Sequence, residues 1–198
     1  MPAYRTRDLL VLPNLVSAAR VPLALAFPFA KTASRASLLL AAAGLTDVLD
    51  GWLARRRGQA TPLGAVVDGF ADKVFAASVL STLVRRGRLS WASALLLAAR
   101  ELVELPLAAR VLASPSAPLF ARERGANALG KLATVLEHAS ALVALLGARP
   151  RRALVAATAI VGLLAATSYW RREIRAVRAR ARGSTRPAAH DALVDLAP

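Results

Sequence analysis

Four aspartates lie at a fixed spacing within otherwise apolar sequence. With an arginine and several small residues they form the pattern D-x2-D-G-x2-A-R-x8-G-x3-D-x3-D, whose members are Asp47, Asp50, Gly51, Ala54, Arg55, Gly64, Asp68 and Asp72. Ionised carboxylates are costly in a bilayer-compatible segment, so four of them need a common partner that offsets their charge. Hard oxygen ligands favour Mg²⁺ or Mn²⁺, and two such ions neutralise four carboxylates. Two-metal sites commonly catalyse phosphoryl displacement.

The small residues and the arginine fit the same chemistry. Gly51, Ala54 and Gly64 let the backbone approach a bulky diphosphate, where a larger side chain would obstruct it. Arg55 carries a planar guanidinium that pairs with phosphate oxygens. The alternative is structural: Arg55 is an ordinary charge at a helix end, and the small residues pack between helices. The complete set at this spacing favours the functional interpretation.

The elements that position these residues are expected to be membrane-spanning helices. The chain has 198 residues, of which 56% are hydrophobic, and its 27 basic and 12 acidic residues give a formal charge of +15. This combination indicates apolar spans with basic ends and an anionic lipid partner, and not a nucleic-acid binder. Open strands leave backbone groups unpaired in lipid, so the spans should be helices.

Six apolar runs approach the roughly 20 residues that a helix needs to cross a bilayer. They cover about residues 9–30, 36–54, 62–84, 89–112, 126–147 and 152–170. We therefore expect an all-α, polytopic membrane protein with about six transmembrane helices in one bundle. Residues 1–170 would form this transmembrane domain, and residues 171–198 a basic cytoplasmic tail that is partly disordered.

The two aspartate pairs occupy facing helix ends in this arrangement. Asp47 and Asp50 are three residues apart at the end of the second run, and Asp68 and Asp72 are four apart near the start of the third. Each pair shares one helix face. Because the intervening loop is short, the two helices should be antiparallel neighbours whose carboxylates converge on one site. The excess of Lys and Arg places that site and both termini in the cytoplasm.

The string from Asp47 to Asp72 resembles the signature of the CDP-alcohol phosphatidyltransferases. The resemblance extends to an amino-terminal pattern formed by Pro13, Asn14 and Arg20, and to Lys73 after the last aspartate. Further positions are similar to the bacterial phosphatidylglycerophosphate synthases in particular, namely Arg100, Glu101, Gly130, Lys131 and Thr134. Together the similar positions cover about residues 9–170.

The resemblance implies a six-helix membrane enzyme, often a homodimer, that transfers a phosphatidyl group from CDP-diacylglycerol to an alcohol and releases CMP. Asp47, Asp50, Asp68 and Asp72 would hold the metals, and Asp72 would also be the general base on the acceptor hydroxyl. The remaining signature positions would surround the CDP moiety, namely Asn14, Gly51, Ala54, Arg55, Thr61 and Gly64.

The acceptor is the part of this reaction on which the sequence departs from the resemblance. The synthases usually read Gly-Lys-x-Lys-Thr in the fifth span, and this chain has Ala133 at the second lysine, which removes a cation able to pair with an acceptor phosphate. Arg100 and Lys131 remain as phosphate partners. Alternatively, Arg100 pairs with Glu104 along its own helix, and Lys131 extends to the interface.

Glycerol 3-phosphate, giving phosphatidylglycerophosphate, is the expected acceptor, with inositol phosphate, serine or phosphatidylglycerol as alternatives. A cation-coupled membrane transporter is a separate class that also uses intramembrane aspartates. A transporter would place them near the midplane with a polar path from both sides. Here all four aspartates lie toward one face of the expected bundle.

Overall fold

A computed structural model describes residues 10–59, 61–113, 128–150 and 152–184. Apart from short turns these residues are helical, which confirms the all-α expectation. The helices are α1 (Leu12–Ala18), α2 (Arg20–Ala26), the 3₁₀ helix η2 (Phe27–Phe29), α3 (Ala33–Arg57), α4 (Pro62–Arg85), α5 (Trp91–Leu97), α6 (Ala99–Ala113), α8 (Ala128–Leu145) and α9 (Arg152–Ser184). The chain divides into two compact units, residues 1–166 and 167–198.

The first apolar run is a broken helix. Pro13 lies in the first turn of α1, and the 3₁₀ helix η2 begins just before Pro28. Between α1 and α2 the N–H of Ala19 is shared by the carbonyls of Leu15 and Ser17, so the turn tightens there before Arg20 starts α2. The break leaves Arg20 at the head of a new helical segment, facing the centre of the bundle.

Four residues, 58–61, separate the end of α3 from the start of α4. Gly58 ends α3 with φ of +61°, a left-handed conformation that glycine adopts without strain. Thr61 begins α4: its side chain accepts a hydrogen bond from the backbone N–H of Gly64 at 3.0 Å, and Pro62 occupies the first helical position. The short turn makes α3 and α4 antiparallel, as the sequence predicted.

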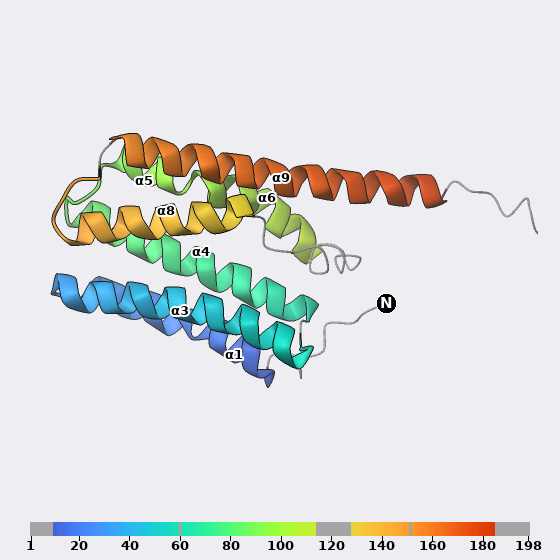
Figure 1. The fold of residues 1–198 in the computed structure, drawn as a ribbon, viewed down its shortest axis with the longest axis horizontal. Helices are drawn as coiled ribbons and strands as arrows, with labels where there is room; N and C mark the ends of the chain where they lie inside the picture. Colours follow the sequence, from blue (N-terminus) through green and yellow to red (C-terminus); the bar gives the residue numbers. More distant parts are fainter. Residues whose placement is uncertain (1–9, 60, 114–127, 151, 185–198) are drawn as a thin grey trace, which may run out of the picture. The chain divides into compact units, whose positions relative to one another are not determined.

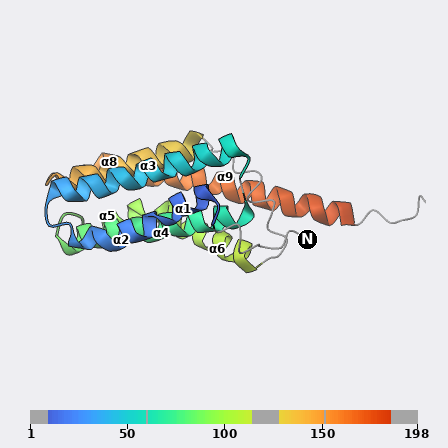
Figure 2. The same cartoon turned by 90° about the horizontal axis from the view of Figure 1, so that it is seen from below.

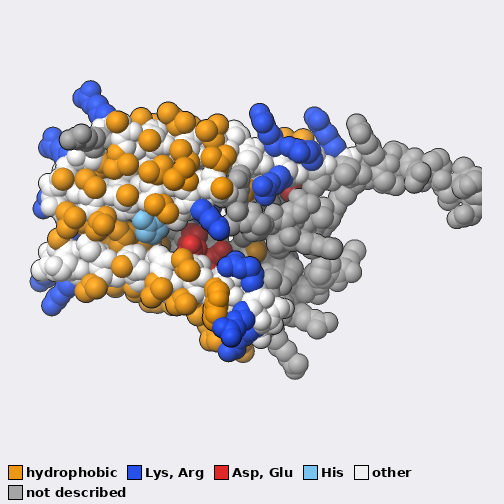
Figure 3. All heavy atoms as spheres, in the orientation of Figure 1, with side chains coloured by type: hydrophobic (Ala, Val, Ile, Leu, Met, Phe, Trp, Pro, Cys, Tyr) orange, Lys and Arg blue, Asp and Glu red, His pale blue; other side chains and the backbone are white. Residues whose placement is uncertain are grey.

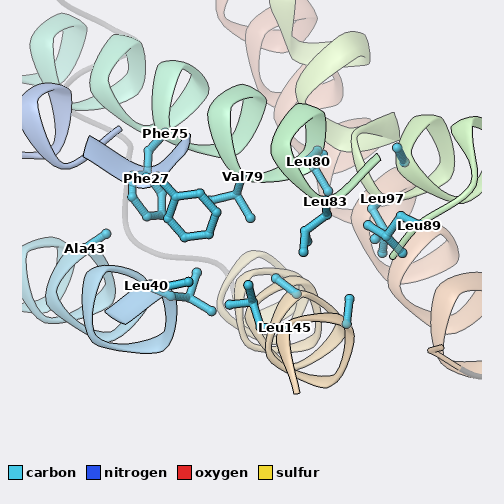
Figure 4. Packing of buried hydrophobic residues seen from close by; sticks show 14 of the residues in the cluster. Phe27, Leu40, Ala43, Phe75, Val79, Leu80, Leu83, Leu89, Leu97 and Leu145 are labelled. Carbon is cyan, nitrogen blue, oxygen red and sulfur yellow. The ribbon is translucent and has the colours of Figure 1, made fainter. Parts of the chain in front are cut away.

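The helices of the first unit form a bundle in which α1 contacts both α3 and α4, and α8 contacts the same two helices (Figure 1 and Figure 2). Its apolar core lies toward the end opposite the aspartates. Phe27 and Phe75 meet edge to face there, with ring centroids 5.9 Å apart, and Leu83 is fully buried (Figure 4).

Four helical stretches are long and apolar enough to cross a bilayer: Leu12–Phe29, Ala33–Arg57, Ala128–Leu145 and Arg152–Arg175. They identify an integral membrane protein. The third predicted run coincides with α4 but carries Asp68, Asp72 and Lys73, and the fourth is divided at Ala98 into α5 and α6. The count of six spans therefore stays a prediction.

The second unit is described only to residue 184. Its described part continues α9 and carries several arginines, among them Arg171, Arg172, Arg175 and Arg178. The basic tail was expected to cover residues 171–198 and to be partly disordered; α9 extends through its first part to Ser184, and residues 185–198 lie outside the described residues.

Candidate functional site

The four aspartates converge around one arginine. Asp47 and Asp50 project from α3 and Asp68 and Asp72 from α4, and the guanidinium of Arg20 forms ion pairs with all four carboxylates. Its Nη1 lies 3.5 Å from Asp47 Oδ1 and its Nη2 lies 2.8 Å from Asp68 Oδ1, while Asp50 and Asp72 are in direct contact with it. The predicted convergence of two helix faces is therefore present in the structure.

The carboxylates differ in their access to solvent. The side chain of Asp50 is 8% exposed and accepts a 2.5 Å hydrogen bond from Ser17 Oγ, whereas those of Asp47 and Asp72 are 44% and 48% exposed. Arg20 lies beneath them at 1% exposure. Asp50 is thus an anchored carboxylate at the base of the site, and Asp72 is the most exposed carboxylate of the four.

The donor set fits hard divalent cations. Carboxylate oxygens of Asp47, Asp50 and Asp68 lie within 4.8 Å of one another, close enough to share a metal ion. Asp72 lies outside that group of three but is joined to it through Arg20. One guanidinium against four carboxylates leaves three negative charges, and oxygen-only ligands of this charge suit Mg²⁺ or Mn²⁺.

Three of the residues assigned to the CDP moiety form a contact between α1 and α4. Asn14 is buried and donates from Nδ2 to Thr61 Oγ1 at 3.2 Å. A Cβ atom on Gly64 would lie 2.1 Å from Asn14 Oδ1, so glycine is required for this approach. The structure thus gives Gly64 a packing role that the sequence analysis, which considered only space for diphosphate, did not anticipate.

The other three residues of this group lie on α3 beside the aspartates. Arg55 is exposed and folds back along its helix, so that its Nη1 lies 3.3 Å from the position of a Cβ on Gly51. Ala54 is half-buried. Arg55 therefore lies against Gly51, the residue after Asp50, and is accessible from outside, a suitable position for pairing with phosphate.

A pocket opens beside Asp47, Asp72 and Arg20. Its polar wall comes from α6 and α8, and its apolar wall from α3, α4 and α8, including Leu40, Phe75, Val79, Leu80 and Ala141. Figure 3 shows acidic side chains and a histidine emerging together between two bands of hydrophobic side chains. The aspartates thus border a space with both polar and apolar surfaces.

Arg100 lines this pocket but already has protein partners. It pairs with Glu101 and Glu137, and its Nη1 donates to Thr134 Oγ1 at 2.9 Å. Glu104, the partner suggested by helical spacing, pairs with Lys73 at 3.7 Å instead. Lys131 is exposed and is not among the described residues that line the pocket, so the structure does not bring it together with Arg100.

Arg20 is the site residue that sequence reasoning undervalued. It was noted only as part of an amino-terminal pattern, although a charged side chain inside an apolar run needs a buried partner. Its distance from the aspartates in sequence, 27 residues from Asp47 and 52 from Asp72, concealed which partners it has. Ser17, one helical turn earlier, gave no comparable signal.

The fold and the site define an all-helical membrane protein with an acidic, metal-type centre. Residues 10–170 match the family model of the CDP-alcohol phosphatidyltransferases, and the chain belongs to this family. No solved structure matches the chain.

Several characterised proteins are similar to part of the chain. It is 41% identical over 86 residues to a CDP-diacylglycerol–glycerol-3-phosphate 3-phosphatidyltransferase of Pseudomonas fluorescens, covering 40% of this chain and 44% of that protein. It is 39% identical over 106 residues to a cardiolipin synthase (CMP-forming) of Streptomyces coelicolor, covering 49% of each. A probable phosphatidylglycerophosphate synthase of Mycobacterium tuberculosis is 45% identical over 64 residues, covering 32% of this chain and 31% of that protein. The chain thus spans less than half the length of each of these relatives.

Proposed function

We propose that the protein transfers a phosphatidyl group from CDP-diacylglycerol to the hydroxyl of an alcohol and releases CMP. The observation that carries this proposal is the convergence of four carboxylates from α3 and α4 beside an open pocket. Membership of the family and the names of the relatives support it. The reaction forms a bond from the acceptor oxygen to the lipid-bearing phosphorus and breaks the bond from that phosphorus to the oxygen that leaves with CMP.

Asp72 is the proposed general base. Its carboxylate is the most exposed of the four and lines the pocket, so an acceptor hydroxyl can reach it there. It takes the proton of that hydroxyl as the oxygen attacks phosphorus. Arg20 holds the Asp72 side chain from below, which fixes its position relative to the other carboxylates.

Asp47, Asp50 and Asp68 are the proposed principal ligands of two Mg²⁺ or Mn²⁺ ions, with Asp72 contributing to the second position. Bound ions would supply electrostatic stabilisation for the charge that develops on the diphosphate. Ser17 keeps the buried Asp50 carboxylate oriented. The ion pairs with Arg20 hold all four carboxylates in place before a metal enters.

The CDP moiety is proposed to lie over the start of α4 and the end of α3. Arg55 pairs with its phosphate oxygens, and the small residues Gly51 and Ala54 leave room for the ligand to approach the helix backbone. Asn14, Thr61 and Gly64 contribute by fixing α1 against α4 at this point. We also propose, from the charge distribution, that the site faces the cytoplasm and, from the resemblance, that the protein is a homodimer.

The acceptor is the finer part of the proposal. The phosphatidylglycerophosphate synthase resemblance and the name of the Pseudomonas relative favour glycerol 3-phosphate, whereas the Streptomyces relative is named for cardiolipin. The names therefore leave more than one alcohol open, with Arg100 as the proposed residue nearest to it and Lys131 as a peripheral cation.

The test is CMP release by the purified full-length protein in detergent–lipid micelles containing CDP-diacylglycerol, Mn²⁺ or Mg²⁺ and a panel of alcohols. CMP and a new phospholipid should form together, and only when metal and an acceptor are both present. If CDP-diacylglycerol remains intact with every acceptor, the proposed activity is wrong.

A further inference from the structure

The guanidinium of Arg100 is saturated by protein groups. Its Nε donates to Glu101 Oε1 at 2.8 Å, and its Nη2 lies 2.6 Å from the same oxygen and 3.5 Å from Glu137 Oε2. Its Nη1 donates to Thr134 Oγ1. All three nitrogens therefore have partners, and two of those partners are carboxylates.

The polar wall that α6 and α8 contribute to the pocket offers few cations to an acceptor phosphate. Among the described residues that line the pocket the cations are Arg100 and Arg20, and Arg20 is held by the four aspartates. Ala133, on the same helix as Thr134, is buried at 2% exposure and offers no charge. A phosphate monoester would have to displace Glu101 and Glu137 from Arg100 and then lie beside both carboxylates.

The same wall presents hydrogen-bond acceptors. Glu101 Oε2 is buried and has no hydrogen-bond partner among the described residues. His138 donates from Nδ1 to the carbonyl of Thr134 at 2.9 Å, so Nε2 of the neutral ring is an acceptor. A buried acceptor without a partner is costly, and a ligand hydroxyl that donates to it removes that cost.

We infer that the acceptor alcohol is an uncharged polyol where it meets this wall: one hydroxyl reacts near Asp72 while a neighbouring hydroxyl donates to Glu101. This inference rests on the proposed phosphatidyl transfer and departs from the glycerol 3-phosphate expectation. The same chemistry is offered by a free polyol such as glycerol and by the glycerol headgroup of a lipid whose phosphate lies outside the wall. The adjoining apolar residues Phe75, Val79 and Leu80 extend the pocket into the bundle.

The first test compares kcat/KM for CMP release with three acceptors: glycerol 3-phosphate, free glycerol and phosphatidylglycerol in mixed micelles. The better of the two acceptors that present an uncharged glycerol group should exceed glycerol 3-phosphate by about tenfold or more, the size of one charged hydrogen bond. The two polyol arms separate a free acceptor from a lipid headgroup. If glycerol 3-phosphate gives the highest kcat/KM, the inference is wrong and the proposed phosphatidyl transfer is unaffected. If no CMP is released with any of the three acceptors, the result counts against the transfer itself.

The second test is the variant Glu101→Gln, which removes the principal partner of Arg100 and one negative charge from the wall. The ratio of glycerol 3-phosphate use to polyol use should rise about tenfold, because Arg100 becomes available to phosphate. Glu104→Gln is the matched control. Glu104 lies one turn further along α6, pairs with Lys73, and is not among the described residues that line the pocket. The ratio of glycerol 3-phosphate use to polyol use should therefore not change in this variant.

If Glu101→Gln does not fold, Glu137→Gln provides the same comparison from α8, since Glu137 is the second carboxylate on Arg100. The expected shift has the same direction and is smaller, because the Glu137 contact is longer. Equal ratios in the Glu101, Glu137 and Glu104 variants would show that this wall does not select the acceptor.

Discussion

Two arginines, the buried Arg20 and the partly buried Arg100, organise the polar interior of this bundle, and they differ in how their charge is balanced. Arg20 faces four carboxylates, so its surroundings retain three negative charges. Arg100 faces two carboxylates and a hydroxyl, and the neighbouring Lys73–Glu104 pair contributes no net charge. The charge of the first region favours cations, and for the second region we propose an uncharged ligand.

If the proposed phosphatidyl transfer is correct, this difference separates the binding of metal and diphosphate from the binding of the acceptor. A large local excess of carboxylates inside a membrane protein is stable only when further cations join it. A network whose positive and negative charges nearly cancel keeps its internal hydrogen bonds, and only its unpaired acceptor atoms are available to a ligand. Arg20, Asp47 and Asp72 belong to the first region and also line the pocket beside the second, so the two regions meet there.

The largest expected effect comes from Asp72→Asn, which removes the proposed base while preserving the shape of the side chain. CMP release should fall by about 10²–10⁴-fold, the usual contribution of a positioned general base. Binding of the first Mn²⁺ ion should be retained because Asp47, Asp50 and Asp68 remain, and binding at the second position should weaken because Asp72 contributes to it. Turnover close to that of the wild type in the folded variant would assign the base elsewhere.

Arg20→Gln tests whether the first region depends on its counter-cation. Without metal, four carboxylates lose their partner, and stability should fall by roughly 3 kcal/mol, toward the lower end for a broken buried pair because three of the carboxylates are partly exposed. Mn²⁺ should recover much of this loss, so the melting temperature should respond to metal more strongly than in the wild type.

Arg86→Gln is the control for that experiment. Its Nη2 donates to the carbonyls of Pro28 and Ala30, far from the aspartates in the sequence, so any loss of stability should be the same with EDTA and with Mn²⁺. If the Arg20 and Arg86 variants respond to Mn²⁺ alike, Arg20 has only a general structural role.

Gly64→Ala should have a smaller effect that is confined to the first region. The new Cβ would overlap Asn14 and force α1 away from α4, at a cost of about 1–3 kcal/mol. The preference among acceptors, which depends on the second region, should not change in the remaining active protein. A change in that preference would mean that the two regions are not separable.

Gly44→Ala is the matched glycine substitution. A Cβ at this position would meet only His138, at 3.7 Å, which is an ordinary contact. Because alanine is favoured over glycine in a helix by up to about 1 kcal/mol, this variant should be as stable as the wild type or more stable. Destabilisation comparable to that of Gly64→Ala would remove the steric explanation.

The sequence predicted what is encoded locally. The spacing of Asp47, Asp50, Asp68 and Asp72, together with the short connection between their helices, was enough to place the four carboxylates together. The Ala- and Leu-rich apolar runs were enough to predict the all-helical class, because in lipid a helix satisfies the backbone hydrogen bonds of such a run. The cap at Thr61 and the glycine that ends α3 follow the usual rules for helix boundaries.

What the sequence did not reveal depends on contacts between distant segments. Arg20 finds its partners, and Asn14 finds Gly64, only after α1 has packed against α3 and α4. Arg100 was expected to pair within its helix with Glu104, yet Glu101 and Glu137 are nearer once α6 and α8 meet. The division of the fourth run at Ala98 also escaped prediction, because neither glycine nor proline marks it.

The hydroxyl of Thr61 has two tasks, since it caps the first turn of α4 and accepts a hydrogen bond from Asn14. Its position therefore sets both where that helix starts winding and how the amino-terminal segment is seated. An insertion before Thr61 lengthens a turn, whereas an insertion after it would rotate everything downstream by about 100° and swing Asp68 and Asp72 off their face together. The chain should tolerate length variation on one side of this threonine and not on the other.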